Sequence, residues 1–283
     1  MPRTVLITGC ASGIGLDAAR TLRARGWRVL ATCRQPADAA RLEAEGLESF
    51  PLDYEDPASV AAGAAEALRR TGGTLDALFN NGAFALPAPL EDVPRASLET
   101  VFAANLFGPH DLTRRLLPAL RASGNGRVVN CSSVLGFLSL RYRGPYNATK
   151  FALEALTDAL RRECAAPEAP GPRVHVVLIE PGPIRTPFRA KSRARLDGLV
   201  DRSASAWSRA WAKKILPRLD AEDPPHLTRF ERRPEAVTRA LIRALESPRP
   251  KPRYYVTPAT WIVAGLTRLL PTRALDRLFA GDV

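Results

Sequence analysis

The sequence predicts an α/β fold, a doubly wound parallel sheet of seven strands with helices on both faces. Short apolar runs alternate with amphipathic helical stretches along most of the chain, as in repeated strand-helix-strand units. The first apolar run leads directly into a glycine-rich loop that opens a helix. Polar residues then follow the ends of several strands, and in a parallel sheet those ends share one edge. No repeat or domain boundary is evident, so residues 1–283 are expected to form a single catalytic domain.

The first strand, residues 4–8, ends in the glycine-rich loop. Glycines let the backbone come close to a phosphate, and the first free amides of the next helix, which runs to about Arg25, point at it. A tight turn without a ligand is the alternative, but three glycines at these spacings directly after a strand favour dinucleotide binding. The candidate cofactor residues in this loop are Gly9, Ser12, Gly13, Ile14 and Gly15.

The ends of the second and third strands bear on the choice of cofactor. The second strand, residues 28–33, is followed by Arg34, where an acidic side chain would accept hydrogen bonds from a free ribose hydroxyl. An arginine can instead pair with the additional phosphate of NADP, so we expect NADP(H) to be preferred over NAD(H). Asp53 closes the third strand, residues 48–52. Its carboxylate can accept from an adenine amino group or cap the next helix, although Asp56 is better placed as a cap.

Asparagines mark two further places along the chain. Asn80, with Asn81, ends the fourth strand, where paired amides can fix backbone turns and line a ligand site. Asn105 and Pro109 interrupt a long helical stretch and predict a kink with exposed backbone groups, or simply a bent core helix. The other expected helices are 36–45, 56–70, 94–121, 145–162, 234–245 and 260–270, and the other strands are 75–79, 127–131, 174–179 and 254–256.

The fifth strand and the helix after it carry the candidate proton donor. Tyr146 and Lys150 are four residues apart, on one face of a helix that begins near Pro145. A phenol titrates near pH ~10, and an ammonium about 4 Å away at an effective dielectric of about 20 is worth about 4 kcal/mol, or roughly 3 pKa units. The pair can therefore form an acid that works near neutral pH, although an ordinary surface pair is the alternative. Tyr142 lies one turn earlier but has no lysine four residues on.

Composition excludes several classes of function. The chain is 46% hydrophobic and 25% charged, as in a globular protein. Four scattered cysteines indicate reduced thiols in a cytoplasmic protein. Cys131 is expected to be a buried, inert thiol rather than a reactive one. Three isolated histidines predict no metal site. Residues 185–253 hold 18 Lys or Arg and 8 Asp or Glu, a net +10 of the total +12. Nucleic acid is not expected as a partner, but this basic region and the apolar tail, about 258–283, leave peripheral membrane contact open.

Residues 4–186, about two thirds of the chain, resemble the classical branch of the short-chain dehydrogenase/reductase family, which has a Rossmann fold. The glycine loop resembles the family's cofactor motif, and Asn80-Asn81-Gly82-Ala83 resembles its Asn-Asn-Ala-Gly with the last two residues exchanged. Ser133 rather than Ser132 matches, because the family places its serine thirteen residues before the tyrosine. The resemblance implies a catalytic tetrad of Asn105, Ser133, Tyr146 and Lys150.

The resemblance also implies a reaction, hydride transfer between NADP(H) and a carbonyl or alcohol. In it Ser133 binds the substrate oxygen, Tyr146 exchanges a proton with that oxygen, Lys150 lowers the pKa of the phenol and holds the nicotinamide ribose, and Asn105 anchors a water of a proton relay. Residues 187–230, irregular and basic in sequence, become a mobile substrate cover. Residues at the sixth strand's end wrap the nicotinamide: Pro181, Gly182, Ile184 and Thr186.

The tail and residues 253–258 resemble a subgroup that acts on retinoids, steroids and other lipophilic aldehydes or ketones. Packing or contact with another copy of the chain is the expected role of the tail, with membrane attachment as the alternative, and we expect a homo-oligomer, a dimer or a tetramer. Two other readings keep the cofactor. One is a non-catalytic dinucleotide sensor, which has no need of the tetrad, and the other is sugar epimerisation, which the tight glycine loop and the chain length disfavour.

Overall fold

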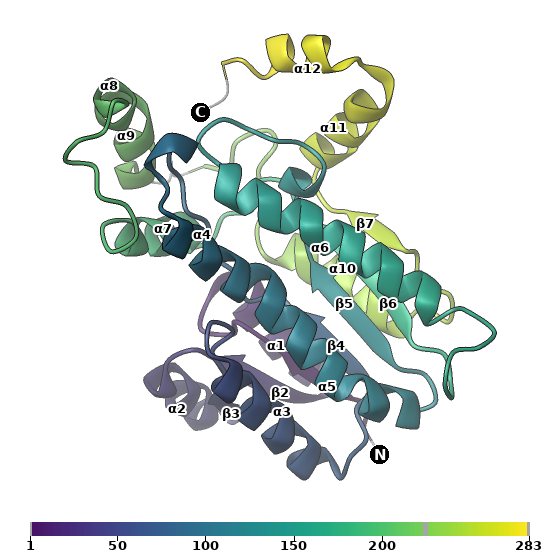
Figure 1. Ribbon diagram of the computed structural model, residues 1–283. Coiled ribbons are helices and arrows are strands. Elements are labelled where there is room, and N and C mark those ends of the chain that lie inside the picture. The colour runs from purple at the N-terminus through teal and green to yellow at the C-terminus, as the bar shows by residue number, and fades with distance from the viewer. Residues whose placement is uncertain (1, 223–225, 282–283) are drawn as a thin grey trace.

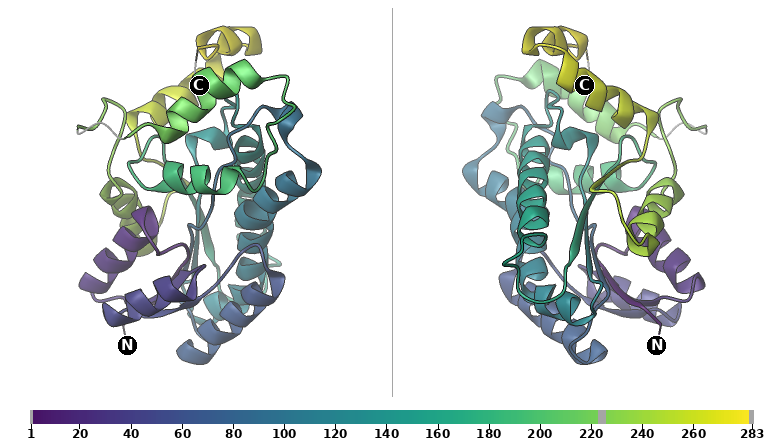
Figure 2. Two further views of the ribbon diagram at one scale, coloured as in Figure 1. Left: turned by 90° about the vertical axis from the view of Figure 1, so that its left-hand side faces the viewer. Right: turned by 90° about the vertical axis from the view of Figure 1, so that its right-hand side faces the viewer.

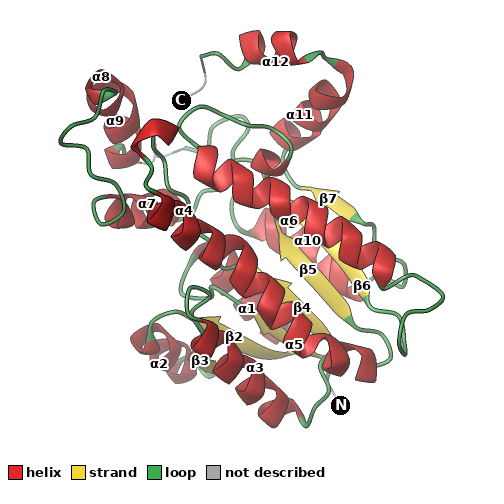
Figure 3. Cartoon of the chain, viewed as in Figure 1, coloured by secondary structure: helices red, strands yellow, loops and turns green. Residues whose placement is uncertain are grey.

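The computed structural model describes residues 2–222 and 226–281 and confirms the expected fold class. Seven parallel strands form one sheet in the order β3-β2-β1-β4-β5-β6-β7 (Figures 1 and 3). The chain therefore winds outward twice from β1, and the carboxyl ends of the strands meet at one edge. The strands are β1 (Thr4–Ile7), β2 (Arg28–Cys33), β3 (Glu48–Pro51), β4 (Ala77–Asn80), β5 (Arg127–Cys131), β6 (His175–Glu180) and β7 (Arg253–Tyr255).

Helices cover both faces of the sheet (Figure 2). Because successive side chains of a strand point to opposite faces, Val5 and Ile7 pack with α1 and α10 while Leu6 packs with α3 and α5. Asp56 caps α3 through the amide of Ala58, as expected. The helices that flank the sheet are α1 (Gly13–Ala24), α2 (Pro36–Ala44), α3 (Pro57–Thr71), α4 (Arg95–Phe102), α5 (Gly108–Ala122), α6 (Gly144–Glu163) and α10 (Glu235–Glu246).

The kink expected near Asn105 is a short π-helical segment, Ala103–Phe107, between α4 and α5. Such a segment inserts one extra residue into a helix and turns its side chains. Here it turns Asn105 into the interior, where the side chain is 1% exposed.

The region expected to be irregular, residues 187–230, is about half helical where the structure describes it, which corrects part of the prediction. It contains α7 (Phe188–Leu196), α8 (Ser208–Ala210), a π-helical segment (Trp211–Ile215) and α9 (Leu216–Asp220). Its helices are too basic for a clear apolar stripe, but Leu196, Val200, Trp211, Ile215 and Leu219 form a small separate core with residues 84–88 and α4. We call residues 187–220 the cover.

The chain ends in two helices that project from the body in Figure 1, α11 (Pro258–Leu269) and α12 (Thr272–Leu278). Trp261, Ile262 and Leu269 on α11 are exposed at 62%, 51% and 82%. Within the described residues, no helix is both long enough and apolar enough to cross a membrane.

Candidate active site

The glycine loop between β1 and α1 has the geometry of a phosphate cradle. Gly9 and Gly13 have φ values of +70° and +58°, which side chains other than glycine rarely adopt. A Cβ on Gly15 would lie 2.4 Å from the carbonyl oxygen of Gly9. Asn81 Nδ2 donates to the carbonyl of Thr8 at 2.9 Å and fixes the loop from the neighbouring strand. The backbone is thus shaped for close approach of a dinucleotide, and the residues present fit that cofactor.

Two side chains complete this loop. Ser12 is the N-cap residue of α1, but its hydroxyl makes no capping bond, so it leaves the first amides of the helix to a ligand. Thr186, which follows β6, lies 3.1 Å from the position a Cβ of Gly13 would take. Ile14 is half-buried and packs against the core beside β1. The sequence-predicted residues of the loop and of the β6 end therefore come together.

Arg34 and Asp53 lie at the ends of β2 and β3, where the adenosine half of a dinucleotide is expected. Arg34 Nη1 is 3.8 Å from Glu55 Oε1, a loose pair on a half-exposed side chain. Glu55 is held more closely by Arg195 of the cover, with two hydrogen bonds of 2.6 and 2.7 Å. Asp53 accepts from the amide of Glu55 through Oδ1. Arg34 can therefore pair with a phosphate without losing a strong partner.

The side chain of Asn80 is bound internally, and a part for Asn80 in cofactor binding stays a prediction. Its Oδ1 accepts from Tyr54 at 2.7 Å, and its Nδ2 donates to Thr113 and Asn130 at 2.9 and 2.8 Å. The side chain is 4% exposed. It holds β4 to β5 and α5, so any contact of Asn80 with the cofactor would not involve its side chain.

Ser133, Tyr146 and Lys150 meet at the carboxyl edge of β5. The Ser133 hydroxyl accepts from the amide of Leu135 at 3.1 Å and hydrogen-bonds the Tyr146 hydroxyl. Lys150 Nζ is 5.5 Å from the centroid of the Tyr146 ring and donates to the carbonyl of Cys131 at 2.7 Å. The tyrosine and lysine share one face of α6, as their spacing predicts.

The pKa values differ from the expectation that Lys150 acidifies the phenol. Burial raises the pKa of Tyr146, and the hydrogen bond from Ser133 only partly offsets this rise. Burial also lowers the pKa of Lys150. The ammonium is directed at the carbonyl of Cys131 rather than at the phenol oxygen. Burial is therefore the largest cause of both shifts, and the groups that lower the pKa of the phenol are Ser133 and Arg143 rather than Lys150.

Asn105 connects two parts of the site. Its Oδ1 accepts from the amide of Phe84 at 3.0 Å, and its Nδ2 donates to the carbonyl of Phe84 at 2.8 Å and to Thr149 Oγ1 at 3.1 Å. The loop after β4 is thereby fixed to the residue before Lys150. The role of Asn105 as anchor of a water remains a prediction.

The segment after β6 packs against the Ser133 loop and the tail. The amide of Val134 donates to the carbonyl of Pro181 at 2.8 Å. A Cβ on Gly182 would lie 2.1 Å from Thr257 Oγ1, so only glycine fits there. Ile184 forms a parallel bridge with Arg232. The bond between Val134 and Pro181 places the start of this segment next to Ser133, and the cofactor contacts of Gly182 and Ile184 stay a prediction.

A buried acidic cluster one turn after Lys150 was not expected from the sequence. Arg253 of β7 bonds Glu154, Glu180 at 2.6 Å and Asp158 at 2.6 Å. Glu180 is fully buried, and burial together with the neighbouring Glu154 raises its pKa. The i,i+4 spacing of Lys150 and Glu154 was the one available signal, since the partners on β6 and β7 are distant in sequence.

Tyr142, Trp207 and Trp211 lie where the cover meets the body. Tyr142 has a φ of +59°, and its ring contacts Trp207 edge-on at 6.1 Å. The indoles of Trp207 and Trp211 donate to Glu91 and Asp92, both at 2.7 Å. A strained residue at such a boundary is typical of functional loops.

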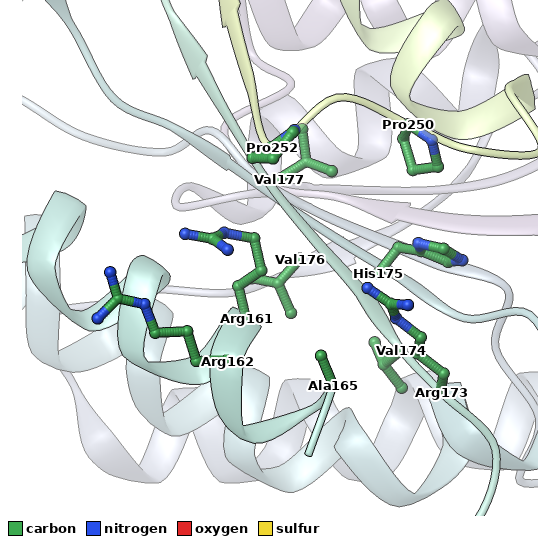
Figure 4. A pocket seen from close by; sticks show the side chains of 10 residues that line it. All are labelled: Arg161, Arg162, Ala165, Arg173, Val174, His175, Val176, Val177, Pro250 and Pro252. Atoms are coloured by element: carbon green, nitrogen blue, oxygen red, sulfur yellow. The ribbon is translucent and has the colours of Figure 1, made fainter. Parts of the chain in front are cut away.

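The other candidates do not contribute to this site. Burial raises the pKa of Cys131 to about 11, so its thiol is not a nucleophile near neutral pH. A cavity of about 300 Å³ lies at the amino end of β6, away from the catalytic candidates, and Val174, His175 and three arginines are among the side chains that line it (Figure 4). Among the described residues, no three His, Cys, Asp or Glu side chains gather as metal ligands would.

Comparisons with known proteins agree with this geometry. Residues 3–197 match the family model of short chain dehydrogenases. The chain is 42% identical over 281 residues to the uncharacterized oxidoreductase YbbO of Escherichia coli (strain K12), covering 99% of this chain and 95% of that protein. It is 37% identical to human retinol dehydrogenase 16, over 88% of this chain and 79% of that one.

A solved structure agrees over nearly the whole length. The crystal structure of a short chain dehydrogenase/reductase from Burkholderia phymatum in complex with NAD has a TM-score of 0.77 and 25% identity, and covers 99% of this chain and 95% of that chain. With the glycine cradle and the Ser133, Tyr146 and Lys150 cluster, these matches identify the chain as a member of the classical short-chain dehydrogenase/reductase family of oxidoreductases, with an NAD(P)-binding fold.

Proposed function

We propose that the chain transfers a hydride between NADP(H) and a carbonyl or alcohol of a lipophilic substrate. The observation that carries the proposal is the convergence of Ser133, Tyr146 and Lys150 beside the glycine cradle. A bound nicotinamide supplies or accepts the hydride. The remaining chemistry is binding and proton transfer by this chain's own side chains.

In the reductive direction, the Ser133 hydroxyl binds the substrate oxygen and Tyr146 donates its proton to that oxygen. The phenol is protonated at neutral pH, as this step requires, although burial raises its pKa and so makes it a weaker acid. Lys150, buried and 3% exposed, supplies positive charge that stabilises the phenolate left behind. In the oxidative direction the same phenol must first lose its proton, so oxidation should speed up as the pH rises.

Apolar side chains support a lipophilic substrate. The ring centroids of Phe188, in the cover, and Tyr146 are 5.7 Å apart. Phe137, in the loop after Ser133, packs against Tyr255 with ring centroids 5.9 Å apart. Tyr255 in turn contacts Trp261 at 4.8 Å. These rings present apolar surface to a substrate held between the cover and the tail.

The preference for NADP(H) rests on Arg34 and on the lack of an acidic residue at the end of β2. The related Burkholderia protein was crystallised with NAD, so the choice needs a direct test. Oxidation of NADPH and of NADH is followed by absorbance with aliphatic aldehydes, retinal and steroid ketones. We expect faster oxidation of NADPH with at least one lipophilic carbonyl. Faster oxidation of NADH would overturn the preference, and tight binding without turnover on any carbonyl would favour the alternative, a dinucleotide sensor.

We also propose that the chain forms a homo-oligomer. Phe107, in the π-helical segment before α5, is 57% exposed, and Phe151 and Leu156, both on α6, are each 43% exposed. Such a patch on neighbouring helices is suited to a second copy of the chain. Light scattering should give the mass of a dimer or tetramer, and Phe151→Glu should reduce it. A monomer mass for the parent would contradict this.

For location, we propose a cytoplasmic protein that touches membranes peripherally through α11. Trp261 and Ile262 are exposed beside Arg268, so apolar and basic side chains share one surface. Sedimentation with anionic vesicles should recover the protein, with less recovery at high salt and for Trp261→Ser. Equal recovery with neutral and anionic vesicles, or no recovery with either, would contradict this proposal.

We also propose that the chain forms one catalytic domain, because β7, which follows the cover, pairs with β6 of the same sheet.

A further inference from the structure

Helix α7 of the cover lies directly against the glycine loop. Lys191 Nζ donates to Ser12 Oγ at 2.7 Å across 179 positions of sequence. The same ammonium lowers the pKa of the Cys33 thiol electrostatically, although burial outweighs this effect. Cys33 is the last residue of β2 and precedes Arg34. Lys191 therefore lies between the glycine loop and the strand end at which a dinucleotide's ribose is read.

Lys191 also differs from Arg193 and Arg195 of α7 in its partners. Arg193 pairs with Asp197 and Asp220, and Arg195 is bound bidentately by Glu55. In the part of the chain that the structure describes, no carboxylate lies within ion-pair distance of Lys191, whose hydrogen bond goes to a neutral hydroxyl. An exposed ammonium held at this place without an anion is suited to a phosphate.

We propose that Lys191 binds the adenosine 2′-phosphate of NADP(H) opposite Arg34. This deepens the proposed function and rests on its NADP(H) preference. The lysine would exchange Ser12 for the phosphate and make the cover part of the cofactor site. Lys191 is thus a second determinant of cofactor choice, in addition to Arg34 at the end of β2.

The proposal has a consequence for the substrate side. Phe188, which contacts the Tyr146 ring, stands one helical turn before Lys191 on α7. Ser192 donates to the carbonyl of Phe188 and lies beside the amide of Ala85 at 3.4 Å. A phosphate that holds Lys191 therefore also holds Phe188 against the catalytic tyrosine. NADP(H) should order the cover more than NAD(H) does.

The test compares Lys191→Met with Lys213→Met, a matched change at an exposed lysine of the cover. Dissociation constants for NADPH and NADH are measured by nicotinamide fluorescence. We expect Lys191→Met to weaken NADPH about tenfold and NADH less than twofold, and Lys213→Met to change neither. Lys191→Arg should keep most of the affinity for NADPH. For Lys191→Met, 2′-AMP should compete with NADPH less well than it does for the parent, whereas 5′-AMP should compete equally well with both proteins.

Hydrogen exchange of residues 188–220 gives a readout that does not depend on affinity. At saturating cofactor, NADPH should protect this segment more than NADH in the parent, and equally in Lys191→Met. If the parent prefers NADPH and Lys191→Met keeps that preference and protection, the inference about Lys191 is wrong while the proposed function stands. Equal weakening of both cofactors would also overturn it, because it would place Lys191 on a phosphate that both share. A parent that prefers NADH would instead remove the proposed preference itself.

Discussion

Gly15→Ala tests the phosphate cradle most sharply. The added Cβ would lie 2.4 Å from Gly9 O and 2.8 Å from Asn81 Nδ2, and the nearer atom is backbone that cannot rotate away. Such overpacking costs roughly 1 to 3 kcal/mol. Alanine in a helix is favoured over glycine by about 1 kcal/mol, which acts in the opposite direction. A clash with backbone should win, with a net destabilisation of about 1 to 2 kcal/mol.

The matched control is Gly265→Ala in α11, where a Cβ would meet nothing within 4 Å. There only the helix propensity acts, so stability should rise by up to about 1 kcal/mol. Urea unfolding measures both variants, and nicotinamide fluorescence measures NADPH binding. Because Gly15→Ala displaces the loop amides, we expect it to weaken NADPH at least about tenfold, whereas Gly265→Ala should not. If Gly15→Ala were as stable as the parent and bound NADPH normally, the close packing of Gly15 against Gly9 and Asn81 would not be what shapes the cofactor site.

Two further predictions concern buried groups. The pKa of Glu180 is raised above 4.5, so the folded chain holds a proton that the unfolded chain releases. The stability this proton contributes is complete below about pH 4.5 and is lost as the pH rises through the raised pKa. The melting temperature should therefore fall between about pH 4.5 and the raised pKa of about 8, and Glu180→Gln should flatten that fall. An equal slope in the variant would exclude this carboxyl. Ser133→Ala should lower kcat at least about tenfold and leave the NADPH dissociation constant nearly unchanged, and an unchanged kcat would remove Ser133 from the chemistry.

The local parts of the fold could be predicted from sequence because their signals are local. The run from Arg127 to Cys131 and the helix that carries Tyr146 and Lys150 were placed correctly, since apolar runs, a proline and a four-residue spacing specify them. The glycine loop could be predicted equally well, because three glycines directly after a strand specify it. The kink at Asn105 was foreseen, but its π-helical form was not, because that form depends on the bonds to Phe84 and Thr149.

The remaining features depend on contacts between distant segments. Arg253 reaches Glu154 and Glu180 only after β7 has joined the sheet. The bonds of Asn80 to Thr113 and Asn130 could not be predicted from sequence, because these partners lie on another helix and another strand. Lys191 gave no signal within a basic segment, and its place beside Ser12 comes from the packing of the cover. The effect of burial on the pKa of Tyr146 was missed for the same reason, since spacing alone reports no desolvation.

The central claim is that the Tyr146 hydroxyl moves the proton that accompanies the hydride. Its direct test is the single-turnover rate of carbonyl reduction by Tyr146→Phe with saturating NADPH, beside Tyr142→Phe as a control that keeps an aromatic ring near the cover. We predict a loss of at least about 100-fold for Tyr146→Phe, with NADPH affinity within about twofold of the parent, and little loss for Tyr142→Phe. A Tyr146→Phe variant that reduces substrate as fast as the parent would contradict the account.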